Sequence, residues 1–297
     1  MGRTFCTSSV VCGVFVSFRA DITSTQWRHT MSNIAHLDTA ALDTAAKFFR
    51  TMQKAGADFT GPLQSTAQRR NLVAYLEMGC PKVDGNGTVV TPQLPDGTDL
   101  CRLILGDDFL SPEDVARVYG FSYSDEQVAN LSEALPDFET LMCLRSNSYM
   151  LVATPPTDHN LLQVRDLGNQ LFYSKSEGWY AEDNQKFSRS DSVKAEMWLA
   201  IRKESYPDSR GKTWDEQTAL LSDNEHVPNA AEVSYAVTAY YKVRGIYLLR
   251  GVYVRTSSVS ADGYRVFVGD FGEDGLYVNH YWFGYRYGYI GVSSSLN

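Results

Sequence analysis

Hydrophobic and polar positions follow two different patterns along this chain of 297 residues. Through much of the first half, apolar residues recur every three or four positions, which indicates amphipathic helices. Towards the carboxyl end, short apolar runs alternate with polar residues and stop at Gly, Asn or Asp, which indicates strands and turns. The pattern therefore predicts a mainly helical region followed by a region of helices and strands.

The helical region contains segments whose first and last residues can be read from the sequence. Ser111 and Ser124 each precede an acid or amide three residues later, so each predicts a capping box at a helix start. The segment 83–99 is rich in turn residues and predicts an exposed loop or hairpin. The elements predicted up to residue 156 are helices over 38–56, 65–79, 111–120, 124–136 and 137–145 and a strand over 148–156.

The second region begins after the segment "TPPTDHN" over 154–160, where the pattern changes. Thr213 with Glu216, and Asn229 with Glu232, predict two further helix starts. Strands are predicted over 170–174, 196–203, 246–258, 264–271, 275–282 and 287–295, and helices over 213–222 and 229–245. Helices followed by a run of antiparallel strands indicate an α+β fold. We therefore expect three parts: a leader or disordered extension over 1–30, a mainly helical region over 31–160, and a ligand-binding domain over 161–297.

The start of the chain leaves two alternatives open. Arg3 followed by an apolar stretch has the order of a signal peptide, but the stretch is short and no clear cleavage site follows. Met31 stands just before the first strongly periodic helix, so translation could begin at Met1 or at Met31. We favour an upstream extension over an export signal, and the compartment stays open, as does the role of residues 31–107.

Composition narrows the classes of function. The net charge of −8 argues against a general nucleic-acid binder, which needs a basic face. No run of eighteen apolar residues occurs, so we expect no membrane insertion. The five cysteines are scattered without C-x-x-C, which indicates neither a zinc site nor a disulfide framework.

A search for catalytic or metal-binding patterns finds none with a specific spacing. The five histidines are His29, His36, His159, His226 and His280, and none stands at ligand spacing from another His or a Cys. Nucleophile-elbow, phosphate-loop and dinucleotide motifs are absent. A carboxylate pair for glycoside hydrolysis stays an open alternative to which no spacing points. We therefore predict a protein without catalytic residues, metal or cofactor.

The most unusual segment lies near the carboxyl end. Ten of the twenty-six residues over 264–289 are aromatic, whereas the overall aromatic content of 12% would give about three. Strand alternation puts Leu276 and Val278, with His280 and Trp282, on one face, and Tyr277, Asn279 and Tyr281 on the other. Aliphatic residues can thus hold the sheet to a core while Tyr, Asn and Gly occupy the opposite face and the turns.

This mixture is typical of a binding surface. Tyrosine gives a large, stiff contact area at low entropic cost, and Gly and Asn give adaptable turns and hydrogen bonds. The alternative is an aromatic core, in which each tyrosine hydroxyl needs a buried partner. We favour the binding surface, because six tyrosines in twenty-six residues would leave many hydroxyls to satisfy.

Several blocks of sequence resemble one family. The segment "HVPNAAEVSYAVTAYYKVRGIYLLRGVYVRTSS" and the later "GLYVNHYW" and "IGVSS" are similar to the variable proteins of diversity-generating retroelements, in particular those of archaea, their viruses and candidate-phylum bacteria. The resemblance runs from about residue 108 to the end. It implies a C-type-lectin-like C-terminal domain whose coding region is rewritten by an error-prone reverse transcriptase acting at template adenines.

The resemblance also implies which residues vary. Template AAY codons become NNY codons, which never encode Trp, Lys, Gln, Met or Glu. The positions marked as variable and ligand-binding are Tyr264, Phe267, Asp270, Gly272, Tyr277, Asn279, His280, Phe283, Gly284, Tyr285, Tyr287, Gly288 and Tyr289. All thirteen belong to the permitted set, while Arg265, Val266, Trp282 and Arg286 between them are expected to be scaffold.

Two features limit what the resemblance implies. Glu273 cannot come from an NNY codon, so it is expected to be fixed. The calcium and sugar motifs of true C-type lectins are absent, as are the domain cysteines of related formylglycine-generating enzymes. The predicted function is therefore non-enzymatic binding of a macromolecule, such as a protein on a cell or virion surface. The alternative is a structural or assembly protein of a virion or cell surface, whose aromatic residues form a subunit interface.

Overall fold

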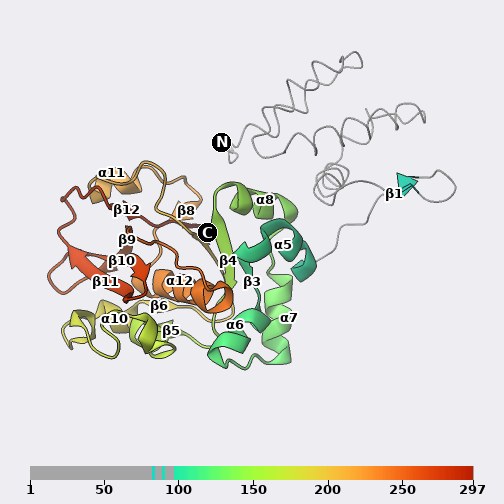
Figure 1. Cartoon of the computed structure of the whole chain (residues 1–297), viewed down its shortest axis with the longest axis horizontal. Helices are drawn as coiled ribbons and strands as arrows, with labels where there is room; N and C mark the ends of the chain where they lie inside the picture. Colours follow the sequence, from blue (N-terminus) through green and yellow to red (C-terminus); the bar gives the residue numbers. More distant parts are fainter. Residues whose placement is uncertain (1–81, 84–88, 91–96, 297) are drawn as a thin grey trace, which may run out of the picture. The chain divides into compact units, whose positions relative to one another are not determined.

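A computed structural model describes residues 82–83, 89–90 and 97–296 of the chain (Figure 1). The chain divides into two compact units, Met1–Asp96 and Gly97–Asn297. In the first unit the structure describes one antiparallel pair, β1 (Lys82–Val83) with β2 (Val89–Val90), within the segment predicted to be a loop or hairpin.

Several predictions fall on residues outside these ranges. They are the leader over 1–30, the choice between Met1 and Met31, and the helices predicted over 38–56 and 65–79.

The second unit has mixed helices and strands, so the α+β fold class is confirmed. Its α-helices are α5 (Gly97–Leu105), α6 (Pro112–Tyr119), α7 (Asp125–Glu133), α8 (Phe138–Ser146), α9 (Leu161–Asp166), α10 (Phe187–Ser190), α11 (Trp214–Thr218) and α12 (Ala230–Arg244). Its strands are β3 (Phe109–Leu110), β4 (Tyr149–Ala153), β5 (His159–Asn160), β6 (Ser192–Val193), β7 (Trp198–Arg202), β8 (Glu225–His226), β9 (Tyr253–Val259), β10 (Arg265–Gly272), β11 (Gly275–Tyr281), β12 (Ile290–Val292) and β13 (Ser295–Leu296). Short 3-10 turns are η1 (Gly106–Asp108), η2 (Asn169–Leu171) and η3 (Trp179–Ala181).

The predicted helix starts at Ser111, Ser124, Thr213 and Asn229 are confirmed. In each, the capping side chain accepts a hydrogen bond from the backbone three residues on, and the side chain at that third position accepts one from the cap backbone. Capping contacts join residues only three apart, so local sequence is enough to fix them.

Three predicted strands are wrong in whole or in part. The strand predicted over 287–295 is divided into β12 and β13, which belong to different sheets. Residues 170–174 do not form a strand: the 3-10 turn η2 ends at Leu171, Phe172 makes only an isolated parallel bridge to Leu276, and a turn follows. The strand predicted over 246–258 begins only at Tyr253. Leu249 and Gly251 have backbone φ angles of 57° and 67°, and this left-handed conformation ends an extended strand.

Two larger sheets organise the unit. The five-stranded sheet has the order β3-β4-β7-β13-β8, and the four-stranded sheet has the order β11-β10-β9-β12. In the latter, β9, β10 and β11 are antiparallel and β12 runs parallel to β9. A smaller antiparallel pair joins β5 to β6.

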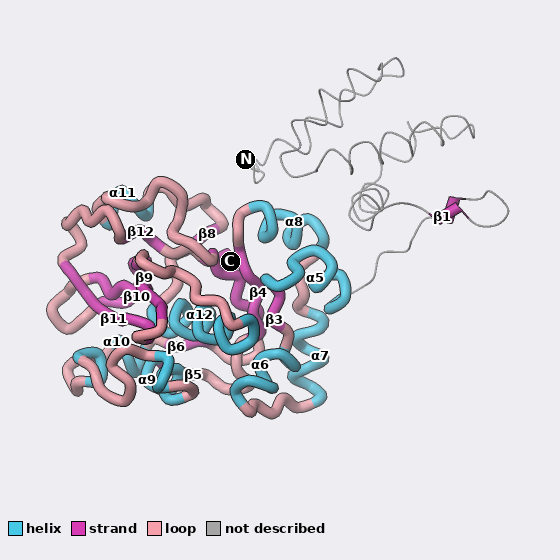
Figure 2. Tube along the Cα trace, viewed as in Figure 1, coloured by secondary structure: helices cyan, strands magenta, loops and turns pink. Residues whose placement is uncertain are grey.

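Helix α12 lies between the two sheets, as Figure 2 shows, and contacts β7 as well as β9 and β10. Its residues Ala230, Ala231, Val233, Ala236 and Ala239 are all fully buried. Small side chains let the helix approach both sheets closely, and a helix that is apolar around most of its surface is typical of a core position. The main core is therefore built around α12.

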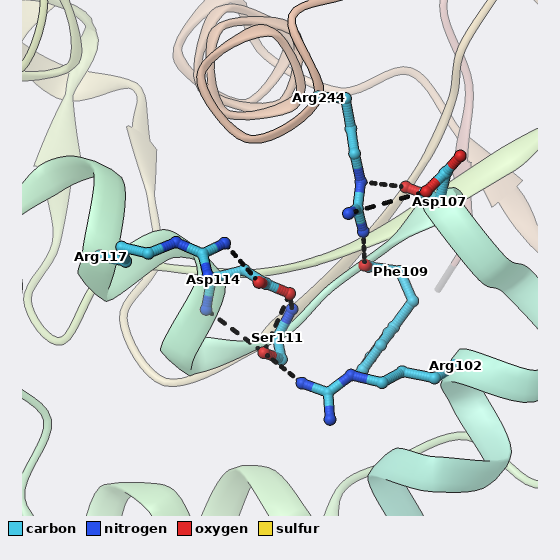
Figure 3. Close-up of polar contacts among 7 residues, drawn as sticks. All are labelled: Arg102, Asp107, Phe109, Ser111, Asp114, Arg117 and Arg244. Atoms are coloured by element: carbon cyan, nitrogen blue, oxygen red, sulfur yellow. Dashed lines mark hydrogen bonds and ion pairs between the residues drawn. The ribbon is translucent and has the colours of Figure 1, made fainter.

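The segment 97–160 belongs to the same unit. At the end of α12, Arg244 donates hydrogen bonds to the carbonyl oxygens of Asp107 and Phe109, at 3.0 and 2.9 Å (Figure 3). Nearby, Ser111 accepts a hydrogen bond from Arg102 at 3.2 Å. The predicted boundary at 154–160 therefore falls inside a compact unit, because strand β4 just before it pairs with β7.

Candidate ligand-binding surface

The four-stranded sheet has two faces of different chemistry. Strands β10 and β11 pair with Val268 opposite Val278. Val266, Val268 and Val278 face the core and are at most 7% exposed. The neighbouring residues Tyr277 and Asn279 point to the other face. The alternation predicted for β11 is thus confirmed, with an aliphatic inner face and a polar and aromatic outer face.

Aromatic side chains from the turn after η2, from β9, from β10 and from β11 with the loop that follows it gather on the outer face. We call this surface the aromatic patch. Its members are Tyr173, Tyr253, Phe267, Tyr277, Tyr281, Tyr285, Tyr287 and Tyr289.

Ring contacts run through the whole patch. Tyr173 stacks on Tyr277 with 4.1 Å between ring centroids. Tyr253 contacts Tyr277 at 6.5 Å, Tyr289 at 6.1 Å and Phe267 at 5.2 Å. Phe267 is only 7% exposed and so forms the floor of the patch. These separations are in the range where aromatic pairs attract one another.

The loop over 282–289 continues the same chain of rings. Tyr285 and Tyr287 lie 4.3 Å apart, and Tyr281 contacts both. Tyr287 also contacts Tyr289 at 5.1 Å. Tyr281, Tyr285 and Tyr289 are between 44% and 48% exposed, so these rings contact neighbouring rings edge-on or at a tilt and still leave part of their surface to water. Exposed apolar surface gathered in one place is typical of an interaction site.

Three tyrosines of the patch have a raised pKa. Hydrogen bonding with Tyr281, together with partial burial, raises the pKa of Tyr287 to about 12. Burial, followed by the nearby carboxylate of Asp270, raises the pKa of Tyr253, and burial raises that of Tyr277. The surface therefore offers rings and neutral hydroxyls, which suit apolar contact with hydrogen bonds at the edges.

The backbone of the loop is held by hydrogen bonds to its carbonyl oxygens. The backbone N–H groups of Trp214, Gly211 and Tyr253 donate to the carbonyls of Phe283, Tyr287 and Tyr289, at 3.0, 2.9 and 2.9 Å. A fourth carbonyl, that of Tyr285, accepts from the Arg255 guanidinium at 2.6 Å. Every residue type has a backbone carbonyl, so this anchoring does not depend on which side chains the loop carries.

Arg255 is the centre of this anchoring. It is 1% exposed, and its other donors reach the Lys212 carbonyl at 2.9 Å and the Gln217 side-chain oxygen at 2.8 Å. Burial lowers its pKa. Among the described residues its acceptors are all neutral, so the burial of the charge is compensated by hydrogen bonds alone. Gln217 in turn donates to the Ile290 carbonyl at 3.1 Å, which fixes the end of the loop.

Glycines in this region fall into two groups. A Cβ atom added at Gly272 or Gly288 would meet no atom within 4 Å. At Gly284 the nearest atoms, at 2.9 Å, belong to the movable Trp282 ring. By contrast, a Cβ at Gly269 would lie 2.2 Å from the Val252 carbonyl oxygen. Of the three glycines predicted to vary, Gly272 and Gly288 thus have room for a side chain, and at Gly284 only the side chain of Trp282 would have to move.

Not all predicted binding residues lie on the patch. Phe267, Tyr277, Asn279, Tyr285, Tyr287 and Tyr289 do. Asp270 has a φ of 45°, and its carboxylate accepts from the Gly251 N–H at 3.0 Å and the Tyr253 hydroxyl at 3.3 Å. These contacts give Asp270 a structural role beside the patch.

His280 and Tyr264 lie on the opposite side of the strand pair. The His280 ring stacks on Trp179 at 4.0 Å, and its Nδ1 lies 3.2 Å from the Ser260 hydroxyl. Burial lowers the pKa of His280. Tyr264 lies 5.9 Å from the same ring. These two residues form a separate cluster at the other face, as alternation along β11 requires.

Phe283 is 44% exposed and contacts the ring of Trp282 at 6.0 Å. Trp282, expected to be scaffold, is itself 50% exposed, so burial gives no reason for its being fixed. Arg286 fits a scaffold role better, because it pairs with Glu216 at 2.6 Å. A backbone hydrogen bond at Thr213, followed by the Arg286 contact, lowers the pKa of Glu216 to about 2.

Three patch residues were not among the predicted positions. Alternation already placed Tyr281 on the face of Tyr277, so that residue could have been found. Tyr253 lies in a strand whose first residue was wrongly predicted. Tyr173 had no local signal, because it joins the patch through the bridge between Phe172 and Leu276, a contact across about a hundred residues.

Within residues 97–296 we find no group of three or more His, Cys, Asp or Glu side chains arranged to hold a metal ion. In the same part of the chain, no helix is long and apolar enough to cross a membrane. Burial raises the pKa of Cys101 to about 11, so this thiol stays protonated at neutral pH.

Comparisons with known proteins found no match: no protein-family model, no curated protein and no solved structure matches the chain.

Proposed function

We propose that this protein is a non-enzymatic receptor or adhesin-like protein whose aromatic patch binds a macromolecular ligand. The ligand would be a protein on another cell or on a virion. The observation that carries the proposal is that Tyr281, at the end of β11, and Tyr285 and Tyr289, on the loop that follows, are each at least 44% exposed while the backbone of that loop is held by the rest of the domain. These rings already contact one another, so they lose little conformational entropy when a ligand binds. More of the free energy of their contacts is then available for affinity.

We further propose a C-type-lectin-like fold for the second unit, with surface residues diversified by a retroelement. Two features support this. The loop carbonyls are bound independently of side-chain type, so many sequences could share one backbone. Gly272 and Gly288, both permitted NNY products, have room for larger side chains. Asn279 is exposed beside the rings and would contribute to specificity.

Sequencing the DNA around the gene tests the diversification directly. We expect a reverse-transcriptase gene and a second near-copy of the final coding segment. Differences between the copies should fall opposite template adenines, in codons such as those of Asn279, Tyr285 and Tyr287. Differences spread equally over the codons of Val266 and Val268 would contradict the proposal.

A second candidate function is assembly, in which the patch is a subunit interface of a virion or cell-surface structure. The gathering of exposed tyrosines in one place favours it, since homo-oligomer interfaces also gather apolar residues. Sedimentation of the full chain over a range of concentrations distinguishes the two. A dimer or larger oligomer that is lost when Tyr281 and Tyr285 are changed to Ala would support assembly, and a monomer would support ligand binding.

A further inference from the structure

A basic groove lies next to the loop that carries the patch. Its larger part is a hollow of about 810 Å³ lined by Arg202, Arg210, Lys212 and Arg286, with Glu204 and Asp208 also on its wall. A smaller hollow of about 250 Å³ shares Arg210 and Glu204 and adds Arg250. Lys203 also lines it, but this cation is paired with Asp108 at 2.7 Å. For a chain with a net charge of −8, this concentration of cations in one place is unusual.

Several cations in the described part of the chain pair with a carboxylate, and Arg286 in the larger hollow is one of them, at 2.6 Å from Glu216. Arg117 and Lys194, for example, each pair with a carboxylate, at 2.8 and 2.7 Å. Within residues 97–296, Arg202, Arg210 and Lys212 have no such partner. Arg210 donates to the Ser205 hydroxyl at 3.0 Å, which leaves its charge uncompensated.

Arg202 is held in place without being neutralised. Its guanidinium carbon lies 5.0 Å from the centre of the Tyr149 ring and 4.9 Å from that of Tyr206. Its Nε atom is buried and makes no hydrogen bond in the described part of the chain. A cation oriented by two rings has lost much of its conformational freedom already, so an anion binding to it would order less side chain.

The shape of the groove favours an extended anion over a single small one. The cations line two adjoining hollows, and the combined space far exceeds that of one phosphate group. The two acidic residues on the wall would repel the continuous charge of a nucleic-acid backbone, but they can be avoided by a peptide with separate carboxylates. Arginine also pairs with carboxylate in a two-pronged geometry.

We propose that this groove binds an acidic polypeptide segment of a partner protein, whose carboxylates pair with Arg202, Arg210 and Lys212. The site is separate from the aromatic patch, and the inference does not depend on the retroelement or on the identity of the patch ligand. Because Arg286 reaches the groove from the patch loop, one partner could contact both surfaces.

The test uses the full chain and fluorescent octaglutamate, with octaglutamine and an oligothymidylate of the same length as comparison probes. Octaglutamate should bind, and salt should weaken the binding, since exposed charges are screened. Arg202→Gln and Lys212→Gln should each weaken it about tenfold, which is the usual loss for a charged hydrogen-bond partner. Arg117→Gln makes the same change of net charge elsewhere and should leave it unchanged. The variant Tyr277→Ala, Tyr285→Ala, Tyr287→Ala should also keep it, so a failure of this proposal is distinct from a failure of the patch.

Four results would overturn the proposal. They are equal binding of octaglutamate and octaglutamine, equal losses in Arg117→Gln and Lys212→Gln, tighter binding of the oligothymidylate, and displacement of octaglutamate by an equal concentration of inorganic phosphate. Because Arg202 packs on two rings, replacing it could also destabilise the fold. The melting temperatures of all variants are therefore measured. If Arg202→Gln unfolds the chain, Arg210→Gln and Lys212→Gln decide the outcome.

Discussion

The inner and outer faces of the four-stranded sheet come from the same strands but contribute differently to the protein. On the inner face, Val266, Val268 and Leu276 are at most 1% exposed and pack in the core around α12. On the outer face, Tyr277 and its neighbours contact one another and remain in reach of water. One strand can thus pack against the core through every second residue and leave the others free to change.

The largest effect is expected where the backbone itself has no room. Gly269→Ala would place a Cβ atom 2.2 Å from the Val252 carbonyl oxygen, in a paired strand that cannot move aside. We expect a loss of about 3 kcal/mol or more in the free energy of unfolding. Urea denaturation measures it. The matched control Gly288→Ala should change stability by less than about 1 kcal/mol, and equal losses would remove the distinction between the two groups of glycines.

Arg255→Met is expected to have the next largest effect. It leaves the Tyr285, Lys212 and Gln217 acceptors buried without their donor, at a cost of about 2–4 kcal/mol. Hydrogen exchange should become faster at Ile290 and other amides of the loop. Arg286→Gln removes only an exposed ion pair and should cost less than about 1 kcal/mol. If the two variants behave alike, the loop is not held through Arg255.

Removing rings from the outer face should have a smaller effect on stability. Changing Tyr277, Tyr285 and Tyr287 to Ala should lower the melting temperature by only a few degrees, since roughly 1 kcal/mol corresponds to about 2–4 °C for a domain of this size. Scanning calorimetry measures this, with Val266→Ala and Val268→Ala as the inner-face control. The same variant should abolish ligand binding. A loss of stability larger than that of the control would favour the aromatic-core alternative.

The smallest effect concerns His280. Burial lowers its pKa in the folded chain, so the unfolded chain binds more protons just below the ordinary histidine pKa of about 6.5. Its neutral form therefore contributes stability above that pH, and the contribution is lost as the pH falls through the folded pKa. His280→Phe keeps a ring on Trp179 and should flatten this part of the pH–stability curve. An unchanged pH–stability curve, or an NMR titration that gives His280 a raised pKa, would contradict the burial of His280 in the cluster with Trp179 and Tyr264.

Local sequence patterns were enough to predict the helix caps and the faces of the strands. Capping boxes at Ser111 and Asn229 join residues three apart, and alternation along β11 fixes which side chains share a face, so both could be predicted without a fold. The α+β class and the aromatic surface followed from the same patterns. Permitted codons marked Gly272 and Gly288, but only atomic packing could tell whether a side chain has room there.

Tertiary structure alone decided how distant segments meet. Tyr173 joined the patch because Phe172 bridges Leu276, and Asp270 became structural because Gly251 and Tyr253 turn towards it. Likewise, the anchoring of the patch loop by Arg255 and the meeting of Arg286 with Lys212 in the groove join segments far apart in the chain. Contacts of this kind carry no periodic signal, because their energy depends on three-dimensional proximity and not on spacing along the sequence.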